Sequence, residues 1–330
     1  MVVALDRRWC TCTRCGQSDV NAPTGYATSE YAHTCAHLGR PRVLPRSGVS
    51  VLVREVDVPF VAADACGPYP LLRTMHWGAL AEDLADTHDL LPFVAVVDPF
   101  STPSSRVLEQ VFPDHRVAFK AHAIAKLDAH APLAHVHADH RRKARRAARL
   151  LEIEVAYDAT QHADAWVRLY AALRARHGFT GAADLPAAAL AAQLELPGML
   201  AVVARASDTV VSMSLWLIDG ATAHYHLGAS EPRGYAAHAS YGTFARAFEV
   251  LAERGVERVD LGGAAGDRDP RAGRDAGHDD GLARFKRGWA TGERTAWLGG
   301  RILDRERYAL FSRHHDDARY FPAYRAKVAA

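Results

Sequence analysis

The hydrophobic positions of the chain follow two periods, one typical of helices and one typical of strands. Apolar residues recur every three or four positions over residues 161–176 and 240–254, which predicts amphipathic helices. Residues 210–218 and 221–227 read as strands, and Asp219-Gly220 between them favours a hairpin turn. The same criteria predict further helices over 28–38, 77–88, 104–112, 186–198 and 305–315, and further strands over 49–58, 93–97, 117–124, 153–157, 200–204, 256–261 and 294–298.

The order of these elements predicts an α+β fold with mixed, mostly antiparallel sheets flanked by helices. Residues 64–70 are expected to form a loop, because glycine and two prolines interrupt them. No Gly-x-Gly-x-x-Gly follows a strand and opens a helix, which disfavours a Rossmann site. There is also no P-loop motif and no Gly-x-Ser-x-Gly nucleophile elbow.

Composition adds few constraints. The 330 residues suggest about two domains, and the net charge of +2 means that any nucleic-acid surface must be local. No apolar run approaches the roughly 20 residues that span a bilayer, and the first residues lack the apolar core of a signal peptide. We therefore expect a cytoplasmic protein that has reduced thiols and does not insert into a membrane. We also expect the protein to be a monomer.

Four of the five cysteines fall in an N-terminal segment, residues 1–40. Cys12-Thr-Arg-Cys15-Gly16 has the form of a zinc knuckle. A structural zinc ion could be bound by Cys10, Cys12, Cys15 and Cys35, with His33 or His37 as alternative ligands. The alternative is an unligated tail followed by one helical cysteine.

A basic run over residues 139–150 predicts a helix with Asp139 as its cap. It is either a solvated helix that links two domains or a phosphate-binding surface for RNA or a nucleotide diphosphate. Its cationic residues are Arg141, Arg142, Lys143, Arg145, Arg146 and Arg149. The nearby histidines at positions 130, 135, 137 and 140 are interpreted as solvated, because no carboxylate or cysteine accompanies them at metal-ligand spacing.

Residues 255–289 combine a helix stop, a short strand, a double glycine, an expected mobile loop and then Phe285-Lys286. A lysine beside an apolar residue after such a loop is a candidate functional residue; the alternative is a surface lysine between Arg284 and Arg287. Asp260 could bind substrate, hold the loop glycines or accept a proton, or it could simply cap the turn.

Four short motifs, in this order, resemble the Fem-type (FemX-like) aminoacyl-tRNA-dependent transferases of the GNAT acyltransferase superfamily. They are Asp64-Ala-Cys-Gly-Pro-Tyr69, the basic run followed by Glu152-Ile-Glu-Val155, Val259-Asp-Leu-Gly-Gly263, and residues 281–289. The resemblance implies two GNAT-like domains, over residues 41–138 and 139–330. The first motif departs from the family's usual Pro-Tyr-Gly-Tyr, because Pro70 follows Tyr69.

The resemblance implies transfer of an aminoacyl group, with alanyl as the first expectation, from tRNA to a free amine of a peptidyl natural product or cell-wall precursor. No cofactor is needed for this chemistry. Lys286 would polarise the reacting carbonyl or the leaving group, with the Phe285 backbone beside it. Tyr69 and Arg73 are candidates for acceptor contact, and Tyr225 or His226 would face the acyl cleft while the other faces solvent.

Two other functions remain open. The first is acyl-coenzyme A-dependent N-acyl transfer, in which Arg233 would lie near the pyrophosphate. The stretch from Arg233 to His238 lacks the Gln/Arg-x-x-Gly-x-Gly/Ala spacing of acetyl-coenzyme A enzymes, which weakens this alternative. The second is a non-catalytic, zinc-bearing RNA-binding protein built on the same scaffold.

Overall fold

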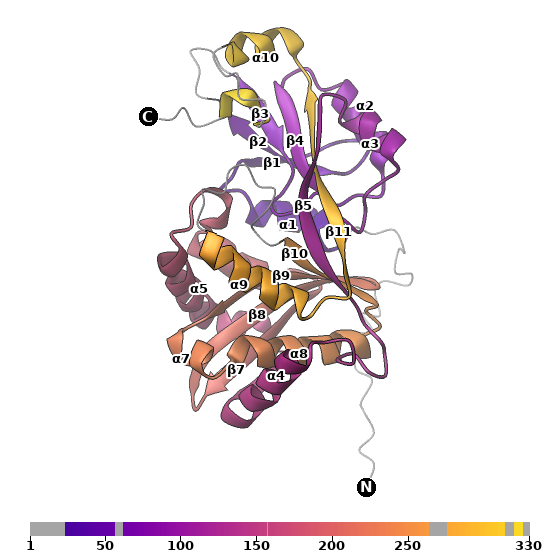
Figure 1. The fold of residues 1–330 in the computed structure, drawn as a ribbon. Coiled ribbons are helices and arrows are strands. Elements are labelled where there is room, and N and C mark those ends of the chain that lie inside the picture. Colours follow the sequence, from indigo (N-terminus) through magenta and orange to yellow (C-terminus); the bar gives the residue numbers. More distant parts are fainter. Residues whose placement is uncertain (1–23, 57–61, 157, 264–275, 314–319, 326–330) are drawn as a thin grey trace, which may run out of the picture.

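A single sheet runs through both halves of the molecule. The computed structural model describes residues 24–56, 62–156, 158–263, 276–313 and 320–325 (Figure 1). Within these residues, eleven strands form one sheet in the order β1-β2-β3-β4-β11-β5-β10-β9-β8-β7-β6. The pairs β3–β4 and β9–β10 are parallel and the other neighbours are antiparallel, which confirms the predicted α+β class.

The N-terminal half packs helices α2 and α3 on the first strands of the sheet. Its core contains the buried side chains of Trp77, Phe93 and Phe112, and the two phenylalanine rings stack with centroids 6.0 Å apart. The elements are η1 (Gly25–Ala27), α1 (Ser29–Thr34), β1 (Arg40–Val43), β2 (Ser50–Glu55), β3 (Ala63–Cys66), α2 (Trp77–Ala85), β4 (Pro92–Val97), α3 (Ser105–Val111) and β5 (His115–Lys126).

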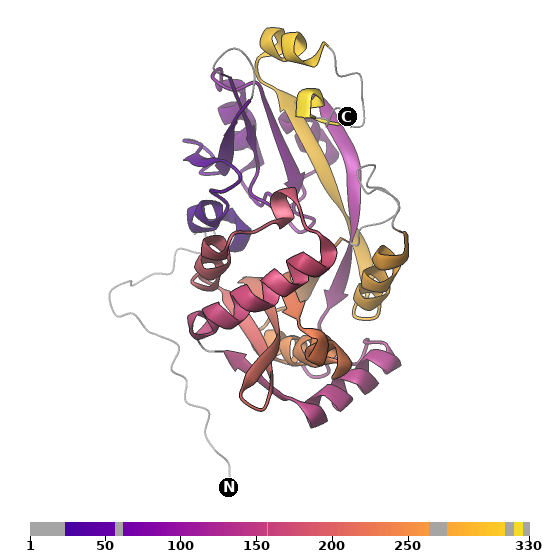
Figure 2. The ribbon, with the colours of Figure 1, turned by 90° about the vertical axis from the view of Figure 1, so that its left-hand side faces the viewer.

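The C-terminal half carries helices on both faces of its strands (Figure 2). Neighbouring residues of β8 point to opposite sides, so Trp216 packs under α8 while Leu215 packs under α5. The elements are α4 (Ala138–Leu150), β6 (Glu152–Ala156), η2 (Ala159–His162), α5 (Ala163–His177), η3 (Gly181–Ala183), α6 (Ala187–Leu194), β7 (Met199–Ala206), β8 (Thr209–Asp219), β9 (Thr222–Ser230), α7 (Pro232–Ala236), α8 (Ala239–Glu253), β10 (Arg258–Gly263), α9 (Ala276–Arg287), β11 (Gly292–Ile302), α10 (Arg305–Ser312) and η4 (Ala323–Arg325).

The two halves exchange strands at their junction. Strand β11, from the C-terminal end, lies between β4 and β5, and β5 lies between β11 and β10. Figure 1 shows β5 and β11 running side by side from one half to the other. Consequently the end of β10 pairs with a strand of the N-terminal half, and residues of both halves meet there.

Four sequence-based expectations about local structure were wrong. Helix α4 begins at Ala138 with His137 as its N-cap, so Asp139 lies in the first turn and is not the cap. Residues 64–66 belong to strand β3, so the expected loop begins only after Cys66. Residues 276–287 form helix α9, although a loop was expected up to Asp280; residues 264–275 of that loop lie outside the described residues. Phe285 and Lys286 of this helix turn toward the core, whereas Leu282 is exposed. His140 is buried against Tyr241, Phe285 and Trp289, and His135 bonds the Trp289 carbonyl at 3.0 Å, so neither is a solvated residue.

Candidate active site

A cavity of about 210 Å³ opens where the parallel strands β9 and β10 separate. The strands pair from Thr222–Arg258 to His224–Asp260 and then diverge. Five residues predicted from the sequence line this cavity together: Tyr69, Tyr225, His226, Asp260 and Lys286. Tyr26, Lys120, His122 and His224 line it as well, so the site draws on both halves of the chain.

Lys286 reaches the cavity from α9 and is almost completely buried, with 7% of its surface exposed. Its Nζ donates a hydrogen bond to the Gly263 carbonyl at 2.7 Å. Burial lowers the pKa of Lys286 to about 8; Asp260 opposes this shift and Lys120 adds to it. Gly262 has a φ of +79°, and a Cβ there would lie 3.1 Å from Nζ, so the glycine allows the lysine to approach.

Asp260 connects the backbone turn to the imidazole of His122. Its Oδ1 accepts the Gly262 N–H at 2.7 Å, so it caps the turn, which was one of the alternatives expected. Its Oδ2 lies 2.8 Å from His122 Nδ1. Asp260 and His122 are only 1% and 6% exposed, so each satisfies the other's polar group in a buried place.

A second buried ionic group lies behind this pair. His224 Nε2 is 3.2 Å from Asp98 Oδ2, and Arg73 donates to the same carboxylate at 2.7 Å. Burial opposes the charge of His224, but the carboxylates of Asp98 and Asp260 raise its pKa. Burial also opposes the charge of Asp98, yet His224 and Arg73 hold its pKa well below the usual range.

Asp98, His224 and Asp260 are the candidate metal ligands among the described residues, with ligand atoms within 4.8 Å of one another. Arg73 and His122 already bond the two carboxylates, which disfavours a metal ion between them. Arg73 also pairs with Asp219, so its guanidinium is held within the protein and does not line the cavity.

His226 and Tyr225 both line the cavity, so the expectation that one of them faces solvent was wrong. His226 Nδ1 lies 3.0 Å from the Tyr26 hydroxyl, and its Nε2 lies 3.1 Å from Gln193 Oε1. Burial lowers the pKa of His226 to about 3, so this imidazole is neutral at physiological pH. The Tyr225 ring packs on Trp216 and Phe244.

The other predicted site residues lie elsewhere or make different contacts. The Phe285 ring packs on Phe244 and Tyr241 and lines a separate cavity of about 670 Å³. Arg233 is exposed on α7 and does not line the cavity at β9 and β10. Tyr69 lies at the cavity mouth with 42% of its surface exposed, and its carbonyl accepts from the Tyr31 hydroxyl.

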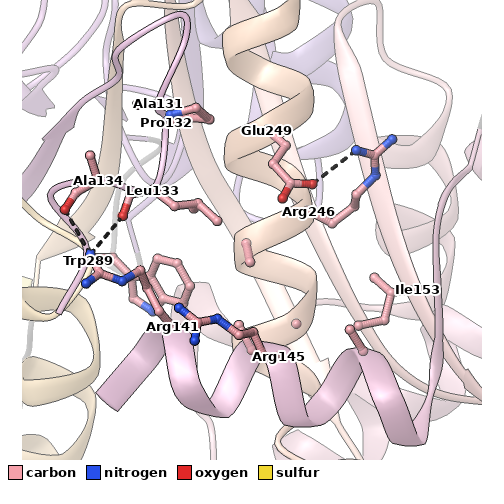
Figure 3. A pocket seen from close by; sticks show the side chains of 14 residues that line it. Ala131, Pro132, Leu133, Ala134, Arg141, Arg145, Ile153, Arg246, Glu249 and Trp289 are labelled. Carbon is pink, nitrogen blue, oxygen red and sulfur yellow. Dashed lines mark hydrogen bonds and ion pairs between the residues drawn. The ribbon is translucent and has the colours of Figure 1, made fainter. Parts of the chain in front are cut away.

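Helix α4 presents part of the predicted cationic surface. Arg142, Arg145, Arg146 and Arg149 are exposed. Lys143 is half-buried and bonds Asp139 at 2.8 Å. Arg141 instead has a structural contact: its guanidinium donates to the carbonyls of Leu133, Ala134 and Val136, beside a groove of about 710 Å³ between α4 and α8 (Figure 3).

The predicted zinc ligands are only partly described. Cys10, Cys12 and Cys15 lie outside the described residues. Cys35 is buried in a cluster with Tyr26 and Tyr31, and burial raises the pKa of its thiol, which disfavours the thiolate that zinc binds. His33 and His37 are exposed. The zinc site therefore stays a prediction.

The sequence offered one local signal for the residues that we did not predict. Lys120 and His122 are two positions apart on an expected strand, so they share a face, and polar residues on an otherwise apolar strand suggest a site. No local sequence pattern indicated that Tyr26 and His224 would lie near Asp260.

Comparisons with known proteins identify one domain and several similar folds. Residues 134–287 match the family model described as an acetyltransferase (GNAT) domain. No curated protein matches the sequence. Among solved structures, FemX is similar with a TM-score of 0.63 at 14% identity, covering 88% of this chain and 96% of that one. The C-terminal domain of a putative lysylphosphatidylglycerol synthetase from Agrobacterium fabrum has a TM-score of 0.57 at 15% identity, covering 86% and 89%.

A third structure, L-PGS from Bacillus licheniformis, has a TM-score of 0.54 at 14% identity, covering 82% of this chain and 87% of that one. The matched region and the similar folds thus point to one class: residues 134–287 resemble a GNAT acetyltransferase domain, and the chain has the fold of proteins that contain such domains. More particularly, the fold resembles that of FemX over nearly the whole chain, as the sequence motifs predicted. No helix of the described residues has the length and apolar character needed to cross a membrane.

Proposed function

We propose that this protein transfers an aminoacyl group from aminoacyl-tRNA to a free amine and forms an amide. The observation that carries the proposal is Lys286, a buried lysine that a backbone carbonyl holds at the point where β9 and β10 separate. With a pKa of about 8, it carries a positive charge in most molecules at neutral pH.

An aminoacyl ester is already activated, so the enzyme must orient the two reactants and stabilise the oxyanion. The Lys286 ammonium has three N–H groups, of which one bonds Gly263. Placed in a buried cavity, this cation favours negative charge on the carbonyl oxygen as the amine attacks. It then favours departure of the ribose oxygen for the same reason.

The size of the cavity supports a small aminoacyl group, and alanyl remains our first expectation. Its volume of about 210 Å³ lies below the roughly 300–1,000 Å³ typical of small-molecule pockets. We expect a peptidyl natural product or a cell-wall precursor as the acceptor, which would enter past the exposed Tyr69 ring.

The exposed arginines of α4 support a tRNA donor, because cationic side chains on one helix can bind successive phosphates. The region before α8 is less suited to the pyrophosphate of coenzyme A. Gly234 in α7 packs directly on strand β8, where a Cβ would lie 2.4 Å from the Val211 carbonyl oxygen. The close packing on β8 therefore explains why position 234 is a glycine, and no bound ligand is needed to explain it.

Coenzyme A remains the second candidate donor, because the matched family model is an acetyltransferase domain. Purified protein should be incubated with an amine acceptor and either charged tRNA or acetyl-coenzyme A. We expect product only with charged tRNA, and we expect RNase to abolish it. Product from acetyl-coenzyme A that resists RNase would favour the second candidate. RNA binding without transfer, unchanged in Lys286→Met, would indicate a non-catalytic protein.

A further inference from the structure

His122 and Asp260 form a hydrogen-bonded pair across two neighbouring strands. His122 lies on β5 of the N-terminal half and Asp260 on β10 of the C-terminal half. The imidazole Nδ1 is 2.8 Å from Oδ2 and 3.1 Å from Oδ1 of the carboxylate. Because Gly262 fixes Oδ1 from the other side, the carboxylate is held in place and in turn orients the ring.

This contact determines which ring nitrogen can act as a base. An ionised carboxylate only accepts hydrogen bonds, so Nδ1 of the neutral ring carries the hydrogen. The lone pair is then on Nε2, the nitrogen that Asp260 does not contact. His122 is one of the residues that line the cavity at β9 and β10, and Nε2 is the ring nitrogen that remains for a bound substrate.

The backbone of Gly263 brings His122 and Lys286 to the same place. Gly263 is directly opposite His122 in the ladder, and its carbonyl accepts the bond from Lys286 Nζ. A Cβ on Gly263 would lie 3.3 Å from His122 Cδ2 and 3.0 Å from Lys120 Cδ. The glycine therefore lets the His122 imidazole and the Lys286 ammonium group approach one peptide group.

We propose that His122, oriented by Asp260, is the general base that accepts the proton of the attacking amine. The inference rests on the proposed acyl transfer to an amine but not on the identity of the donor. Lys286 is suited to the opposite task, because it is mostly protonated at neutral pH. Among the charged groups and carboxylates that line the cavity with His122 are Asp260 on β10, His224 on β9, Lys286 on α9 and Lys120 on β5. Arg294 on β11 lies opposite His122 in the ladder, and the other titratable groups of the lining are Tyr26, Tyr69, Tyr225 and His226.

The step balances without a further reactant. The amine nitrogen forms a bond to the acyl carbon, the carbonyl becomes an oxyanion beside Lys286, and a proton passes from nitrogen to Nε2 of His122. The tetrahedral intermediate then breaks its bond to the ribose oxygen, which takes the proton back from the imidazolium. The products are an amide and a free hydroxyl. With a thioester donor, the thiol leaves in the same way.

His122→Gln and Asp260→Asn test this role in the full-length chain. Gln can still bond Asp260 but does not accept a proton at neutral pH. Asn can still accept the Gly262 N–H. Its amide NH2 group would, however, donate to Nδ1 of His122, so the ring hydrogen would move from Nδ1 to Nε2. We expect kcat to fall by about 10²–10⁴ for His122→Gln, with the KM of the donor unchanged. His162→Gln is the matched control, since His162 is half-buried outside the cavity and should retain full activity.

A readout that a structural role would not change is chemical rescue. Added imidazole should restore activity to His122→Ala by filling the space of the missing ring, and it should not restore Lys286→Met. A His122→Gln rate within threefold of wild type, or a His122→Ala variant that folds but shows no rescue, would overturn the proposal.

Nitrogen-15 NMR measures which ring nitrogen of His122 carries the hydrogen, and this test needs no donor substrate. We expect the neutral His122 ring to carry its hydrogen on Nδ1, and Asp260→Asn to shift it to Nε2. A hydrogen on Nε2 in the wild-type protein would refute the proposal even if no substrate were known. Activity with acetyl-coenzyme A alone, lost in His122→Gln, would instead refute the tRNA donor and support the base.

Discussion

The buried charge of Lys286 has a measurable effect on stability. Replacing Lys286 with methionine keeps the length and most of the volume of the side chain but removes the ammonium group. The native protein releases the Lys286 proton near pH 8, whereas the unfolded chain retains it until about pH 10.5. Between these values the unfolded state binds more protons, so this group makes the wild-type protein more stable as the pH rises.

The magnitude follows from the two pKa values. The difference between 10.5 and about 8 corresponds to roughly 3 kcal/mol, of which about 2.5 kcal/mol develops between pH 7 and pH 10. With only 7% of the residue exposed, solvent screening reduces this value little. The Lys286→Met protein lacks this contribution. From pH 7 to pH 10, the unfolding free energy of the wild-type protein should therefore rise by that amount relative to the unfolding free energy of Lys286→Met.

Urea unfolding at pH 7, 8, 9 and 10 measures this difference, because titrations common to both proteins cancel. Lys126→Met is the control, since Lys126 is an exposed lysine on the same sheet. In parallel, Lys286→Met should lower the transfer rate by about 10²–10³, as expected for loss of an oxyanion-stabilising donor. A stability difference that stays constant from pH 7 to pH 10 would refute the assignment of a buried, charged lysine.

Three further predictions concern the surrounding structure. Reversing Arg145 and Arg149 to glutamate should weaken tRNA binding and reduce the slope of log affinity against log salt by about 1–2 in a filter-binding titration, whereas Arg106→Glu on α3 should change neither. Trp289→Ala should cost about 3–5 kcal/mol in urea unfolding, because the ring is fully buried against Phe244 and Phe248; a loss below 1 kcal/mol would contradict this packing. Metal analysis should find close to one zinc ion per chain and less in Cys12→Ser, whereas a metal-free protein with reactive thiols would exclude the zinc site.

The regular elements were predictable because their periodicity is local. Helix α8 and the β8–β9 hairpin follow directly from apolar spacing and from Asp219-Gly220. Helix α9 was missed because Gly277 and Gly281 suggested a loop, although Leu282, Phe285 and Trp289 already had helical spacing. Strand β3 was missed for a similar reason, since Gly67 and the following prolines lie just after its last residue.

Only part of the candidate site could be predicted from the sequence. Asp260 and Lys286 were found from the strand-turn pattern and the family resemblance, and the cavity brings them together. His122 was not found, because its partner Asp260 is 138 positions away in the sequence and the register of β5 against β10 decides the contact. His140 was interpreted as solvated because nothing local showed that α9 would cover it.

The strand exchange explains why an acyltransferase domain alone does not account for this site. The residues that match the acetyltransferase (GNAT) family model, 134–287, supply Asp260, Lys286 and the diverging strands β9 and β10. They do not include β5, which supplies Lys120 and His122 and closes the free edge of β10. Nor do they include β11, which holds β5 against the N-terminal half. The lysine that would stabilise the oxyanion thus comes from one half and the proposed base from the other, so the chemistry requires both.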